Sequence, residues 1–140
     1  GQGASLTVPL GDMSLVVSSS QMDVGGTEDS SAGGALTMTA GGGTLSLGIE
    51  TTSGDTAATE GEAYSVSYST TMGSAAVAVG YSGYDANSTT SSRTDVTLSQ
   101  SIGGGASVFA EFQNLTGAGV AAEGNSTSES VVAIGTSVSF

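Results

Sequence analysis

The chain of 140 residues carries 13 acidic residues against one Arg and no Lys, so its formal net charge is −12. This balance excludes nucleic-acid binding, because a protein needs clustered Lys and Arg to displace the counterions of phosphate groups. The absence of Cys and His excludes thiol and imidazole chemistry and leaves the serines without an activating base, so we predict no enzymatic activity.

Alternating apolar residues predict about nine β-strands, and no stretch of about 18 apolar residues points to a transmembrane helix. An apolar residue at every second position is the pattern of a strand with one buried face. The interleaved residues are small and polar, as with Ser65, Ser67 and Ser69. In chain order, the alternating segments are 4–10, 13–17, 36–40, 45–49, 64–68, 77–81, 96–102, 108–112 and 132–140.

The predicted connections between these strands alternate in length. Tight turns are expected at residues 11–12, 41–43, 72–74 and 103–105, about thirty residues apart, which fits two strands with one tight turn and one loop. Long polar connections are expected at residues 21–33, 51–61, 83–92 and 114–128. Short connections at one edge and long ones at the other are typical of outer-membrane barrels, with tight periplasmic turns and extended outer loops.

The composition of the two strand faces favours a membrane barrel over a soluble fold. A soluble β-sandwich fills a core about 10 Å thick with large side chains, whereas these faces are either small and polar or only moderately bulky. We therefore expect residues 1–140 to form one all-β segment of an antiparallel up-and-down transmembrane β-barrel. A soluble sandwich, a β-solenoid and an eight-stranded barrel remain alternatives, although residues such as Ser65 and Ala76 fill a small barrel poorly.

Aromatic residues are expected to mark the edges of the membrane. Tyr64, Tyr81 and Phe112 occupy apolar positions of the alternation. Each lies near the end of its strand that is next to a long connection. We predict that these three residues form an outer aromatic girdle at the level of the lipid headgroups, with Phe140 at the opposite rim.

The charged residues divide between the loops and the polar face. Glu50 and Glu111 have lumen parity, and Arg93 and Asp95 are expected there too, so we interpret these four as lumen or mouth charges that influence ion permeation. Asp12 belongs to a tight turn. An external negative mouth that attracts cations, or a loop-bound divalent cation, is a hypothesis for the remaining acids: Glu28, Asp29, Asp55, Glu60, Glu62, Asp85, Glu123 and Glu129.

Three segments resemble alphaproteobacterial general porins. The chain ends in SVVAIGTSVSF over residues 130–140, which resembles the terminal assembly signal of outer-membrane barrels. Residues 95–110, DVTLSQSIGGGASVFA, resemble the penultimate hairpin of these porins, and residues 10–14, LGDMS, resemble another of their short turns. The signal positions in this sequence are Val132, Ile134, Val138 and Phe140.

The resemblance implies the C-terminal portion of a sixteen-stranded, usually trimeric barrel in the bacterial outer membrane. It implies passive diffusion of small hydrophilic solutes or ions, contact with outer-membrane lipid and recognition by the barrel assembly machinery. Counting strands back from a periplasmic Phe140 places the first strand's start outside, and complete single-chain barrels have an even strand number, so we expect a segment of a larger barrel. The alternative function is an acidic secreted structural or adhesive β-protein, as in a surface layer or filament.

Overall fold

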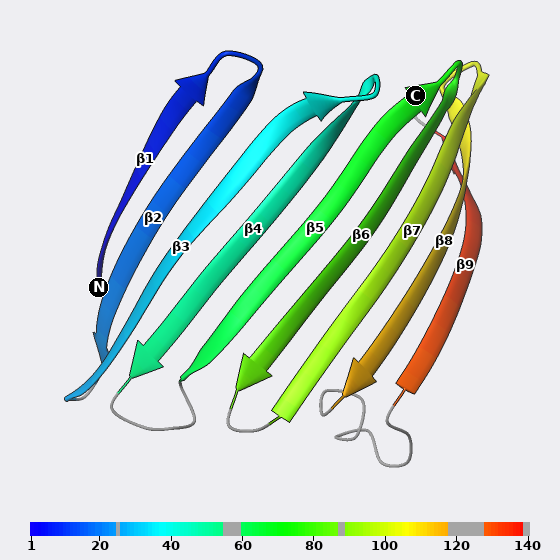
Figure 1. Cartoon of the computed structure of the whole chain (residues 1–140). Coiled ribbons are helices and arrows are strands. Elements are labelled where there is room, and N and C mark those ends of the chain that lie inside the picture. Colours follow the sequence, from blue (N-terminus) through cyan, green and yellow to red (C-terminus); the bar gives the residue numbers. More distant parts are fainter. Residues whose placement is uncertain (25, 55–59, 87–88, 118–127, 139–140) are drawn as a thin grey trace.

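The computed structural model describes residues 1–24, 26–54, 60–86, 89–117 and 128–138, which form nine β-strands and no helix (Figure 1). Within these residues no helical segment has the length and apolarity needed to cross a membrane. The strands are β1 (Gln2–Leu10), β2 (Met13–Val24), β3 (Thr27–Ala40), β4 (Gly43–Gly54), β5 (Gly61–Met72), β6 (Ala75–Ala86), β7 (Thr89–Gly103), β8 (Ala106–Gly117) and β9 (Ser128–Val138).

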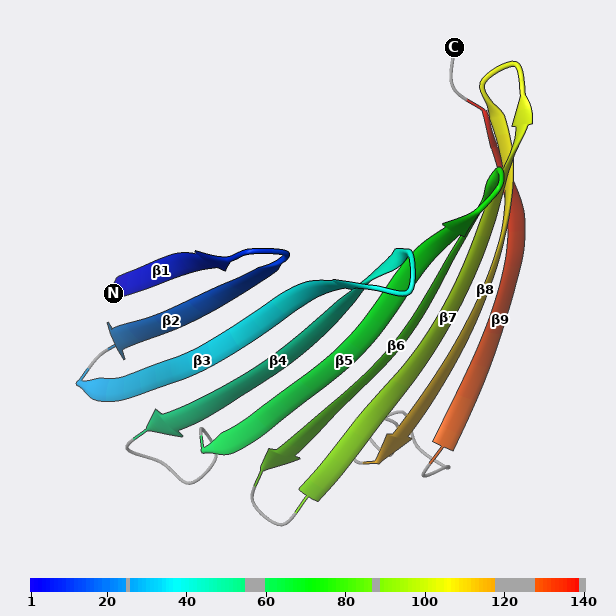
Figure 2. The same ribbon diagram turned by 45° about the horizontal axis from the view of Figure 1, so that its top comes forward.

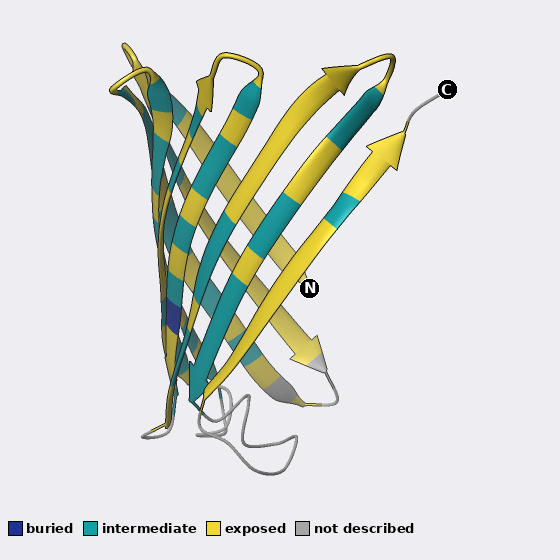
Figure 3. Cartoon of the chain, turned by 90° about the vertical axis from the view of Figure 1, so that its right-hand side faces the viewer, coloured by how far each residue is buried: buried dark blue, intermediate teal, exposed yellow. Residues whose placement is uncertain are grey.

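The strands form a single antiparallel sheet in which each strand pairs with the next along the chain. This up-and-down order confirms the predicted fold class and the expected number of strands. Figure 2 shows that the sheet curls from β1 to β9, and Figure 3 shows that the curl stays open. The described sheet is therefore a partial barrel with β1 and β9 at its two edges.

Tight turns join alternate strand pairs at one end of the sheet, as the sequence predicts. They connect β1 to β2, β3 to β4, β5 to β6 and β7 to β8. Gly11 and Gly73 each have a φ of 66°, in the left-handed region that glycine adopts without a steric penalty. Such residues allow a two-residue hairpin turn to match the twist of its strands.

The strand register shows that the strands tilt relative to the line of tight turns. Met13 pairs with Met38, but β3 continues two residues further before it turns at Ala40. In the same way, Gly43 pairs with Thr70, and β5 continues to Met72 before its own turn. A stagger of about one residue per strand, with a rise of about 3.3 Å and a strand spacing of about 4.8 Å, gives a tilt of about 35°.

The predicted long connections are wrong in extent, because much of each segment is strand. Residues 21–24 and 27–33 belong to β2 and β3, and residues 83–86 and 89–92 belong to β6 and β7. Residues 51–54 and 114–117 likewise continue β4 and β8. Ser20 and Ser31 are register partners whose hydroxyl groups lie 2.9 Å apart, so pairing continues where the apolar alternation has ended. Five acids expected in or beside loops lie within strands: Glu28, Asp29, Glu62, Asp85 and Glu129.

Candidate functional site

The register separates the side chains of the sheet into an apolar face and a polar face. Strand side chains alternate between the two faces, and register partners share a face. The neighbouring rows of the sheet therefore show the contrast directly. One row of partners across six strands is wholly apolar: Leu45, Tyr68, Val79, Val96, Phe112 and Val132. The adjacent row, on the opposite face, is Ser46, Ser67, Gly80, Asp95 and Gln113.

The apolar face carries its large side chains exposed, in a band that begins at the tight turns. Ile134 is 81% exposed and Met72 is 70% exposed. On β4, β6 and β8 the last large apolar residue of this face lies six residues from the strand's tight-turn end, and on β5 it lies eight residues from that end. An apolar band on the outer face is what contact with lipid requires. The residues at this edge are Ile49, Tyr64, Tyr81 and Phe112.

The three residues predicted to form an aromatic girdle all lie on the apolar face. Tyr64 and Tyr81 have ring centroids 6.0 Å apart, with the ring planes inclined at 39°. Phe112 lies on β8 at the same edge of the apolar band. Phe140 lies outside the described residues, whereas Ile134 and the other described positions of the C-terminal signal share the apolar face.

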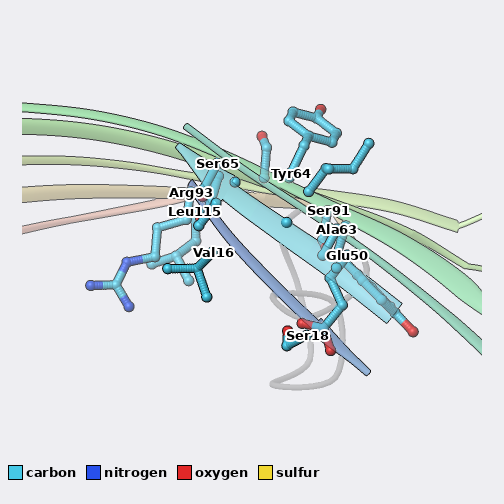
Figure 4. A pocket seen from close by; sticks show the side chains of 18 of the residues that line it. Val16, Ser18, Glu50, Ala63, Tyr64, Ser65, Ser91, Arg93 and Leu115 are labelled. Carbon is cyan, nitrogen blue, oxygen red and sulfur yellow. The ribbon is translucent and has the colours of Figure 1, made fainter. Parts of the chain in front are cut away.

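The polar face contains a groove that extends across strands β2 to β8. The groove has a volume of about 570 Å³, and its lining includes Glu50, Arg93 and Tyr84. Figure 4 shows Glu50 and Arg93 on one side of the strands and the Tyr64 ring on the other. Most of the remaining lining consists of small residues, and Val16 and Leu115 are larger. The small residues are Ser18, Gly33, Gly34, Ala35, Gly48, Ala63, Ser65, Ser82, Gly83, Ser91 and Ser92. A wall of this kind offers hydroxyl groups to water and little bulk to obstruct it.

Arg93, the only Arg of the chain, forms an ion pair with Asp95 in the same strand. Its Nε donates to both carboxylate oxygens of Asp95, at 2.7 Å to Oδ1 and 2.9 Å to Oδ2. Gln113, the register partner of Asp95 on β8, donates from Nε2 to Oδ1 at 3.1 Å. The Gln113 contact depends on the β7–β8 register, which shifts between Ser101 and Gly103 and which sequence reasoning did not predict.

The four predicted lumen charges lie on the polar face, but only two of them touch. Glu50 lies on β4 and Glu111 on β8, each separate from the Arg93–Asp95 pair in the described hydrogen bonds and ion pairs. Glu111, at the middle of β8, is the one nearest the tight turns. Between its level and those turns, the polar face of the described strands holds no charged side chain.

Metal binding has no support from the described residues. Within them, no group of three or more acidic side chains is arranged to hold a metal ion. Asp55 and Glu123, which belong to the hypothesis of a loop-bound divalent cation, lie outside the described residues.

Comparison with known proteins identifies the fold. No protein-family model matches the sequence, and a search of curated proteins gives no match. Among solved structures, the chain is similar to an anion-selective porin from Comamonas acidovorans, with a TM-score of 0.67 and 16% identity over 82% of this chain and 38% of that one. It is also similar to a loop L8 deletion mutant of OmpT, an outer-membrane protein of Vibrio cholerae, with a TM-score of 0.69 and 14% identity over 94% of this chain and 51% of that one.

A third similar structure is a BenF-like porin from Pseudomonas fluorescens Pf-5, with a TM-score of 0.61 and 12% identity over 92% of this chain and 46% of that one. The chain thus spans between 38% and 51% of the length of these three structures. The nine described strands have the fold of part of an outer-membrane β-barrel.

Proposed function

We propose that this chain forms part of the wall of an outer-membrane porin through which small hydrophilic solutes or ions diffuse passively. The observation that carries the proposal is the pairing of an exposed apolar band on one face with a hollowed face of mostly small side chains on the other. A barrel needs both faces at once, because lipid surrounds it and water fills it.

The exposure of the apolar face supports a lipid partner. Leu6, Ile49 and Val132 are each more than half exposed. Exposing a contiguous apolar surface to water costs about 25 cal/mol for each Å², so a soluble chain avoids it or covers it. A lipid bilayer would supply the cover, and we propose the bacterial outer membrane because single-chain barrels of this fold lie there. Nothing favours the alternative of an acidic secreted structural or adhesive protein.

We extend the proposal to a larger barrel and to its assembly. The open sheet and the partial coverage of the similar structures support a barrel with further strands, for which we propose sixteen. One of the similar structures is a trimer form of OmpT from Vibrio cholerae, and we propose a homotrimer for this protein as well. Recognition of the C-terminal signal by the barrel assembly machinery belongs to the same proposal. No catalysis, cofactor or nucleic acid takes part.

Extraction and conductance test the porin function together. Native protein should leave the envelope fraction only with detergent and should produce stepwise ion conductance when it is added to planar lipid bilayers. Release into buffer without detergent, or filaments without conductance, would contradict the proposal and favour the secreted alternative.

A further inference from the structure

The polar face carries more negative than positive charge at the level where its charged residues gather. Glu50, Asp95 and Glu111 lie between the middle of their strands and the ends away from the tight turns. Arg93 is the only positive side chain of the whole chain. Around these residues the groove is lined mostly by Ser, Gly and Ala, with Tyr84, Val16 and Leu115 as its larger side chains on this face.

The Asp95 carboxylate pairs with the Arg93 guanidinium and keeps it close to the polar face of the sheet. The side chain of Asp95 is 26% exposed and that of Arg93 is 50% exposed, and both carboxylate oxygens accept from the Arg93 Nε. Gln113 fixes the carboxylate from the neighbouring strand through its contact with Oδ1. Asp95 is thus held from two sides, and the pair has no net charge. Glu50 and Glu111 have no positive partner among the described residues.

We propose that Asp95 sets the ion selectivity of the pore: by neutralising Arg93 it leaves Glu50 and Glu111 to favour cations. The proposal rests on the proposed porin function and deepens it by naming the class of permeating ion. It assigns to this chain the opposite preference from the anion-selective porin whose fold it shares.

Carboxylates on a pore wall act on a passing ion over a useful distance. A low-dielectric wall focuses the field of its charges into the water-filled space and raises the local counterion concentration. The Debye length is about 10 Å at an ionic strength of about 0.1 M, so the field extends well beyond the first water layer. Because the charges are absent from the turn side of the described polar face, selection should occur on the side of the longer connections.

The test is the reversal potential of the full-length native protein in a planar bilayer under a KCl gradient around 0.1 M. The wild type should be more permeable to K⁺ than to Cl⁻. Asp95→Asn removes one negative charge and releases Arg93, so it should lower the permeability ratio by about two-fold or more. Glu111→Gln changes the charge of the wall by the same one unit, so it should lower the ratio to a similar extent.

Two further variants test whether Asp95 neutralises Arg93, and whether the position of a carboxylate matters beyond the net charge of the protein. The double variant Arg93→Gln with Asp95→Asn keeps the wild-type net charge and should restore the wild-type ratio. Asp12→Asn removes a carboxylate from the tight turn between β1 and β2, away from the level of the charged residues, and should leave the ratio unchanged. A wild-type ratio in Asp95→Asn, or a double variant that resembles Asp95→Asn, would overturn the role of Asp95.

The same recordings separate this inference from the porin function. A conducting wild type that prefers Cl⁻ overturns the selectivity proposal alone. Absence of any conductance from folded wild-type protein overturns the porin function and the selectivity proposal with it. If Asp95→Asn does not fold, the sign of the wild-type reversal potential and the Glu50→Gln variant still decide, because loss of Glu50 should also reduce the preference for K⁺.

Discussion

Tyr64 covers Gly83 across the β5–β6 pair. The two residues are direct register partners, and a methyl group added at Gly83 would overlap the Tyr64 ring, with the ring Cε1 only 2.7 Å away. The same arrangement recurs on the polar face, where Phe109 covers its partner Gly135 on β9. A glycine in a strand loses more conformational freedom than other residues, and an aromatic ring laid over it supplies the missing packing.

We predict that Gly83→Ala destabilises the barrel by about 1 to 3 kcal/mol, because the added methyl group must displace the ring. The midpoint of urea unfolding, followed by heat-modifiable mobility on gels, measures the loss. Gly80→Ala is the matched control, since its nearest neighbour would lie at 3.8 Å. If Tyr64→Ala fails to relieve the cost of Gly83→Ala in the double variant, the Tyr64 ring is not its cause.

Tyr68 anchors the tight turn between β3 and β4. Its hydroxyl donates to the carbonyl oxygens of Ala40 and Gly41, both at 3.2 Å. Tyr68→Phe should cost about 0.5 to 1.5 kcal/mol, the usual net contribution of a hydrogen bond. Tyr84→Phe serves as the control, because the Tyr84 hydroxyl makes no hydrogen bond within the described part of the chain. Equal stability of both variants in the urea titration would show that the hydroxyl does not support the turn.

Within the apolar band the sequence predicts the strands correctly. Beyond the band, on the side of the long connections, it misses their continuation. Apolar alternation locates the tight turns because both strands of a hairpin are apolar up to the turn. Beyond the band the alternation ends, as at Ser18 to Ser20, while main-chain pairing continues to Val24. The period of the side chains therefore marks the edge of the apolar band and not the end of the strand.

The sequence predicts on which face of the sheet the charged residues lie, but it does not predict which of them are in contact. Strand parity places Glu50, Arg93, Asp95 and Glu111 on one face, since that needs only the alternation of a single strand. The contact of Gln113 with Asp95 needs the register between two strands, and an irregularity at residues 101–103 changes that register. Bulges of this kind leave no reliable sequence pattern.

The C-terminal residues offer a test of assembly that is separate from folding. Ile134 and Val132 are 81% and 66% exposed on the edge strand β9, in the alternation that leads to residue 140. Deletion of Phe140 should reduce the amount of protein in the outer membrane of cells severalfold. Refolding of the same variant into detergent should proceed normally, because the proposal gives the residue a role in recognition and not in folding. A matching loss in both assays would indicate a structural role instead.

Val79 and Ala78 give a direct test of which face meets lipid. They are neighbours in the central strand β6, and Val79 belongs to the apolar face and is 45% exposed, whereas Ala78 pairs with Ser69 and Thr97 on the polar face. A lysine on the lipid side of a barrel costs about 2 to 4 kcal/mol near the bilayer midplane, whereas the water-filled side tolerates it. Val79→Lys should therefore unfold at a clearly lower urea concentration in lipid vesicles.

Ala78→Lys should keep the stability of the wild type in the same vesicles but lower the preference for cations, because it adds a positive charge to the lumen. Both variants add one lysine, so net charge cancels in the comparison. Strand propensity differs between Val and Ala by less than about 1 kcal/mol, which is below the cost expected for a lysine in lipid. If Ala78→Lys proves the more destabilising variant, the assignment of the faces is reversed. If both are tolerated equally, the apolar band does not lie in lipid, and the argument for a membrane barrel loses its main support.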